Sequence, residues 1–195
     1  AVTEVIEPFL RDGTGLCQMP CPEQIAWGGV GKRHMVRFWG RPRTARLARF
    51  GLPAFLGYTR LRNRRLARRV AESIADYQAN GVSIVALVGV GASPSCGVAS
   101  TVDVAAALDS VVGCPFARLD RQVVNDAIAG ATRSGPGIFM DELGRALGRR
   151  GLSVPLREHD LRSERPGSHL SPGAHPVTLD VDRVVTRAPL PWQRR

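Results

Sequence analysis

Apolar residues recur at helical spacing in three segments of the chain, residues 2–11, 59–79 and 138–147. This period gathers the apolar side chains of each segment on one face, so we expect three amphipathic helices. Asn80-Gly81 follows the second segment and predicts its end, because glycine readily adopts the left-handed conformation found after a helix C-terminus.

Residues 82–90 form the most hydrophobic run of the chain, which is short, rich in β-branched residues and placed directly after a helix. These properties predict a buried parallel strand. Shorter apolar runs predict strands at 15–19 and 152–156. Residues 100–113 are expected to form a helix or a variable excursion, and residues 119–130 another helix. Helices that alternate with strands in this way favour a single α/β domain.

Two segments lack such periodicity. Residues 27–58 mix glycine, proline, arginine and aromatic residues and are expected to be an irregular insert. From about residue 160, proline, glycine, serine, arginine and histidine prevail, so we expect one domain over residues 1–158 and a poorly ordered tail over 159–195. The chain enters directly into the first helix, and we expect the natural N-terminus to lie upstream.

The formal net charge of +10 raises the question of a nucleic-acid partner. Lys32 is the only lysine, and arginine accompanies abundant alanine, glycine and valine, as expected of a GC-rich genome. Solvated helix faces therefore explain the charge better than a polyanion site, although the arginine cluster at residues 60–69 keeps an RNA-binding module as an alternative.

No run of about 18 or more apolar residues is present, which argues against a membrane span. No signal peptide precedes the first helical segment, so we expect a cytoplasmic protein. In that reducing compartment the four cysteines should be thiols or metal ligands and not disulfides.

Two of the cysteines lie in loops that follow predicted strands, in Pro20-Cys21-Pro22-Glu23 and in Ser93-Pro94-Ser95-Cys96-Gly97. In an open α/β sheet, ligands bind beyond the carboxyl ends of the strands. Two thiolates held there on short loops suit a soft metal such as iron or zinc. Burial as small apolar residues is the alternative, but it explains little for cysteines in loops rich in glycine and proline.

Polar side chains beside these cysteines are candidates for acid–base chemistry. Glu23 could donate or accept a proton in the same cavity, or could instead cap a helix or lie in solvent. Ser93 and Ser95 could orient a substrate, or could cap a turn. Cys17 is expected in the core, with ligation or redox coupling to Cys21 as the alternative, and Cys114 is expected to be structural.

Other cofactor sites are poorly supported. The pattern Gly89-x-Gly91 does not extend to a dinucleotide-binding fingerprint, because Pro94 stands where a helix should open. Of the four histidines, His34 lies in the irregular insert and the other three lie in the expected tail, which argues against a histidine-rich metal centre.

Two segments of the sequence resemble the paired signatures of the thiouracil desulfurase (TudS) family, and more closely those of its TudS-related desulfidases. They are Gln18-Met19-Pro20-Cys21-Pro22-Glu23 and Gly91-Ala92-Ser93-Pro94-Ser95-Cys96-Gly97-Val98. Residues 137–143 are similar to the final helix of that family. The resemblance covers roughly residues 1–157 and excludes the tail.

The resemblance implies a Rossmann-like three-layer domain with a mostly parallel sheet, and a 4Fe-4S cluster held by three cysteines. Cys21 and Cys96 match two of these ligands, and the family's first ligand lies upstream of the part present here. The implied activity is a cluster-dependent desulfidase that removes sulfur from a small thiolated compound such as a thio-nucleobase. Glu23 would transfer the proton, and Ser93 would orient the substrate or the attacking water. A non-catalytic iron-sulfur or zinc protein is the alternative.

Overall fold

The computed structural model describes residues 2–27, 42–112, 114 and 121–159. Its helices are α1 (Val2–Arg11), α2 (Pro22–Trp27), α4 (Pro42–Ala79), α5 (Val104–Ser110), α6 (Arg121–Gly130) and α7 (Ile138–Gly148). Its strands are β1 (Leu87–Val90), β2 (Ser100–Val102), β3 (Thr132–Ser134) and β4 (Leu156–His159). This mixture of helices with paired strands, two of them parallel, agrees with the expected α/β class.

The helix predicted for residues 59–79 is the second half of a much longer one. Helix α4 starts at Pro42. The prediction of an irregular insert over 27–58 was therefore wrong for residues 42–58. Proline is favoured in the first turn of a helix, and the alanine, leucine and arginine that follow are strong helix formers. The rest of the expected insert, 28–41, lies outside the described residues.

The end of α4 confirms the role expected of Asn80-Gly81. Gly81 has a φ of +79°. The amide of Val82 donates to the carbonyl of Tyr77 at 2.9 Å, which closes the last turn. A left-handed residue followed by such a bond is the usual way to satisfy carbonyls at a helix C-terminus.

The strands form two small sheets. β1 pairs parallel with β4, with Leu87 opposite Leu156 and Val90 opposite His159, and β2 pairs antiparallel with β3. The parallel strand expected after α4 is therefore confirmed, although it is confined to Leu87–Val90. The strand predicted for 152–156 is shifted to Leu156–His159, one residue into the expected tail, whose remaining residues, 160–195, lie outside the described residues.

The strand predicted for residues 15–19 does not form. This segment has no regular secondary structure, and Leu16 is 52% exposed. Apolar composition alone favoured a strand there, but a strand needs a neighbour with free backbone groups. In the described part of the chain, β1 pairs with β4 and not with this segment.

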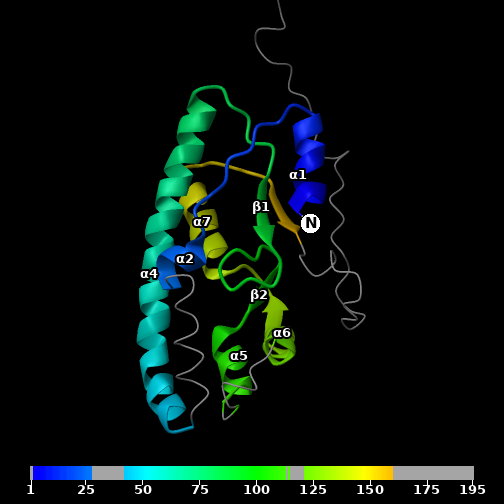
Figure 1. Ribbon diagram of the computed structural model, residues 1–195. Helices are drawn as coiled ribbons and strands as arrows, with labels where there is room; N and C mark the ends of the chain where they lie inside the picture. The colour runs from blue at the N-terminus through cyan, green and yellow to red at the C-terminus, as the bar shows by residue number, and fades with distance from the viewer. Residues whose placement is uncertain (1, 28–41, 113, 115–120, 160–195) are drawn as a thin grey trace, which may run out of the picture.

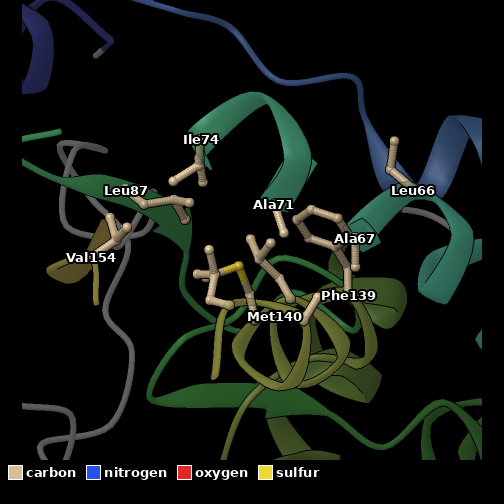
Figure 2. Close-up of a cluster of buried hydrophobic side chains, with 11 residues drawn as sticks. Leu66, Ala67, Ala71, Ile74, Leu87, Phe139, Met140 and Val154 are labelled. Carbon is tan, nitrogen blue, oxygen red and sulfur yellow. The ribbon is translucent and has the colours of Figure 1, made fainter. Parts of the chain in front are cut away.

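The hydrophobic core lies where α4 and α7 pack against β1 (Figure 2). Ala67 and Ala71 of α4 are fully buried, and their small side chains let α7 approach closely. Phe139 and Leu143 of α7 are each only 1% exposed, which confirms the inward face predicted for that helix. Burial of two such side chains supplies several kcal/mol at about 1.5–3 kcal/mol each.

The elements divide into two groups along the long helix α4 (Figure 1). One group contains β1, β4 and α7, and the other contains β2, β3, α5 and α6. The loop between β1 and β2 lies at their junction, close to α2. None of the described helices is long and apolar enough to cross a membrane.

Candidate active site

The loop that joins β1 to β2 carries Ser93 and Cys96, and it is fixed by backbone hydrogen bonds on two sides. The amide of Val90 donates to the carbonyl of Cys96 at 3.1 Å, which folds the loop back on β1. The amides of Gly137 and Ile138, at the start of α7, donate to the carbonyls of Gly97 and Pro94 at 2.9 and 3.0 Å. The loop is thus part of the packed structure.

Glycine is required where this loop meets its neighbours. A Cβ on Gly137 would lie 2.5 Å from the carbonyl group of Ser95, and a Cβ on Gly97 would overlap the carbonyl oxygen of Ser100. Real side chains do not tolerate such contacts with backbone atoms, so only glycine allows this approach. The small residues noted in the sequence therefore serve close backbone packing within the protein.

Glu23 reaches this loop from α2. Its Oε1 accepts hydrogen bonds from the hydroxyls of Ser93 at 3.3 Å and Ser95 at 3.4 Å. Both distances exceed the usual range for a hydrogen bond between a hydroxyl and an oxygen, so these contacts are long and weak. The structure thus brings together two residues that the sequence proposed for catalysis, Glu23 and Ser93.

The short helix α2 is positioned by α4. The indole Nε1 of Trp27 donates to Thr59 Oγ1 at 2.8 Å, and the Trp27 ring stacks on Phe55 with centroids 6.2 Å apart. Arg62 donates to the carbonyl of Ile25 at 3.4 Å. Since Thr59 is only 1% exposed, this contact fixes α2, and with it Glu23, to the long helix.

Ser93 has the turn-capping role that was one of its two predicted functions, and it also contacts Glu23. Its Oγ accepts a hydrogen bond from the amide of Cys96 at 3.1 Å and one from the amide of Ser95 at 3.4 Å, which is the turn-capping role. The same hydroxyl donates its proton toward Glu23. Capping of the loop therefore orients this hydroxyl toward the carboxylate.

Cys96 lies at the end of this polar chain. Its Sγ is 3.6 Å from the hydroxyl of Ser95, which is 2% exposed and links the thiol to Glu23. Cys21 is exposed and immediately precedes α2, where its carbonyl accepts from the amide of Ile25 at 3.2 Å. Cys96 is thus linked through Ser95 to Glu23, whereas Cys21 lies two residues before Glu23 in the chain.

The other two cysteines lie elsewhere. Cys17 was expected in the core, but it is exposed, because the strand that would have buried it does not form. Its Sγ lies 3.9 Å from the hydroxyl of Tyr77, and this hydrogen bond raises the pKa of Tyr77. Cys114 is partly buried beyond α5, where its amide donates to the carbonyl of Val111 at 3.1 Å.

Glu158 of β4, which binds this loop, was not identified from the sequence. Its Oε2 accepts hydrogen bonds from the amides of Val98, Ala99 and Ser100 at 2.7, 2.6 and 3.0 Å. Its Oε1 accepts from the Ser100 hydroxyl at 2.8 Å. The placement of the last strand at 152–156 left Glu158 outside it. The sequence feature that could have identified Glu158 is a carboxylate near the carboxyl end of a predicted strand, because functional side chains of parallel sheets gather there.

Thiolates are the ligand type that soft metals prefer, so Cys21 and Cys96 are candidate ligands by their chemistry. In the described ranges, however, no group of three or more histidine, cysteine, aspartate or glutamate side chains is arranged to hold a metal ion. Cys21, Cys96 and Glu23 therefore do not form such a group by themselves.

Comparison of the chain with protein-family models, with curated proteins and with solved structures gave no match.

Proposed function

We propose that the protein is an iron-sulfur-dependent desulfidase that removes sulfur from a small thiolated compound such as a thio-nucleobase. The observation that supports this most directly is the contact between Glu23 Oε1 and the hydroxyl of Ser93. These residues lie in separate motifs, each of which also carries a cysteine resembling a cluster ligand of the thiouracil desulfurase family.

Cys21 and Cys96 would hold the cluster. When bound, a 4Fe-4S cluster with one open iron supplies a Lewis acid for the sulfur of the substrate. The parallel pairing of β1 with β4 supports a Rossmann-like arrangement, in which the loop after β1 leads into the ligand site.

The remaining chemistry falls to the residues between the two cysteines. Glu23 would take a proton from the attacking water and return one to the product. The hydroxyls of Ser93 and Ser95 donate to its Oε1, so they would hold the carboxylate in one orientation. Ser95, which is 2% exposed, would also exclude bulk water from the side of Cys96.

The test is anaerobic purification of the full-length protein, followed by quantification of iron and acid-labile sulfide. We expect iron and sulfide in the ratio of a 4Fe-4S cluster, and sulfide release when thiouracil is added. Cysteine-to-serine variants at Cys21 and Cys96 should lose iron, whereas Cys114→Ser should retain it. A colourless, iron-free protein would refute the cluster, and a loaded protein without sulfide release would favour a non-catalytic iron-sulfur protein.

Two arginines of the cluster at residues 60–69 make contacts within the protein, which weakens the RNA-binding alternative. Arg60 binds the carboxylates of Glu142 and Asp141, and Arg62 binds the carbonyl of Ile25, so both have structural roles. The other four arginines, all on α4, are exposed: Arg64, Arg65, Arg68 and Arg69. Salt-dependent binding of RNA that is lost when these four are replaced by glutamine would restore this alternative.

A further inference from the structure

Glu158 closes the loop that carries Ser93 and Cys96. Three consecutive amides, from Val98 to Ser100, converge on a single oxygen of its carboxylate, at distances of 2.6 to 3.0 Å. Backbone amides that point to one place form a nest for an anion. Here the anion is a side chain of the same protein, from a strand 58 to 60 residues further along the chain.

The geometry of the sheet delivers the carboxylate to this nest. In the parallel register Glu158 lies opposite Gly89, and its side chain passes Gly91, where a Cβ would be only 3.0 Å from Oε1. Ser100 adds a second link, because its hydroxyl donates to Glu158 at 2.8 Å and accepts from the amide of Ala92 at 2.8 Å. Both ends of the loop are thereby connected to one carboxylate.

The surroundings favour the ionised form of this group. Partial burial by itself raises the pKa of Glu158, but the hydrogen bonds from Ser100, Ala99 and Val98 outweigh it and leave the pKa below its ordinary value. In the described part of the chain, three amides and one hydroxyl donate to this carboxylate, and it forms no ion pair. Hydrogen bonds to a charged acceptor are stronger than those between neutral groups.

We propose that Glu158 is a positioning residue, an internal anion that fixes the Ser93–Cys96 loop in its working conformation before any metal or substrate binds. This proposal rests on the proposed function in one respect only, because that function makes Cys96 of the loop a cluster ligand and Ser93 the hydroxyl that orients the substrate. The negative charge is the essential property, because three amide donors share one oxygen. An uncharged side chain of the same shape should therefore not replace it.

The test compares Glu158→Gln with the wild-type protein by hydrogen exchange of backbone amides, followed by mass spectrometry. We expect exchange in residues 91–100 to accelerate about ten-fold or more, since bonds to a charged acceptor are worth at least the 1.4 kcal/mol that this factor represents. Exchange in α7, residues 138–148, should stay unchanged. The matched control is Glu72→Gln, which removes an exposed carboxylate bound to Arg150 at 2.8 Å and should leave the loop unaffected.

Equal exchange of the loop in Glu158→Gln and wild type would overturn the proposal, because shape alone would then suffice. Parallel acceleration in the loop and in α7 would also overturn it, since that indicates a general loss of stability.

If Glu158→Gln does not fold, Ser100→Ala gives the same contrast with a smaller increase, because it removes one donor. Iron content after reconstitution is the second readout, and Glu158→Gln should hold less. A wild-type protein without iron would refute the cluster but not the exchange result.

Discussion

The carboxylate of Glu23 lies 3.3 Å from the hydroxyl of Ser93, although 70 residues separate them in the chain. Neither residue could be assigned a function from its own motif, since a glutamate can cap a helix and a serine can cap a turn. Their contact joins the two segments that carry Cys21 and Cys96 and brings a carboxylate to a hydroxyl, which is compatible with the proposed hydrolytic removal of sulfur.

Replacement of Glu23 by glutamine should lower the rate of sulfide release from thiouracil by about 10²- to 10⁴-fold, the usual contribution of general acid–base catalysis. The isosteric amide keeps the size of the side chain, so iron content should stay at the wild-type value. The rate is measured on the cluster-loaded protein with Glu72→Gln as the control. A normal rate would exclude Glu23 from proton transfer.

Replacement of Gly97 by alanine should disrupt the cysteine loop, because the new Cβ would overlap the carbonyl oxygen of Ser100. We expect a loss of about 1–3 kcal/mol in the free energy of unfolding, as for other overpacked sites. Gly144→Ala is the matched control. Apart from its chain neighbours and the backbone of its own helix, nothing lies within 4 Å of the added Cβ. Because Gly144 sits inside helix α7, the alanine should stabilise the protein by about 0.5–1 kcal/mol. Urea denaturation measures both, and equal effects would contradict the packing argument.

The stability of the protein should decrease in acid partly because of Glu158. Folding lowers the pKa of this carboxyl below its ordinary value of 4.5, so the unfolded chain binds the proton more readily. The stabilisation is therefore complete above the ordinary pKa and is lost as pH falls through the lower pKa of the folded state. Thermal unfolding of Glu158→Gln should depend less steeply on pH below about 4.5 than that of wild type. Identical slopes would show that Glu158 does not contribute.

Replacement of Arg60 by alanine should destabilise the packing of α4 on α7. Arg60 Nε donates to Glu142 Oε1 at 2.8 Å, and the hydrogen bond raises the pKa of Arg60. Glu142 is only 5% exposed, so its carboxylate would lose a donor in a site with little water. Since Arg60 is half exposed, we expect a moderate cost of about 1–2 kcal/mol in the free energy of unfolding.

The matched control for Arg60 is Arg64→Ala, one turn further along the exposed side of α4. It should change stability by no more than about 0.5 kcal/mol, as is usual for surface substitutions. Chemical denaturation of the two variants separates a structural arginine from a solvated one. Equal losses would mean that the contact with Glu142 adds nothing to stability.

The sequence alone determined the features that depend on neighbouring residues. Helical spacing predicted α1, the second half of α4, and α7, and Asn80-Gly81 marked the end of α4. The two cysteine motifs also identified Glu23 and Ser93 as candidates. These predictions succeed because helix periodicity, helix ends and turns are decided within a few residues of the chain.

Only the tertiary structure decided which segments meet. β1 pairs with β4 and not with residues 15–19, so Cys17 is exposed and the last strand extends to His159. That pairing also brings Glu158 to the amides of Val98, Ala99 and Ser100, a contact that no local pattern encodes. The physical reason is that strand partners and buried carboxylates are selected by the free energy of the whole fold, in which distant residues satisfy each other's hydrogen bonds.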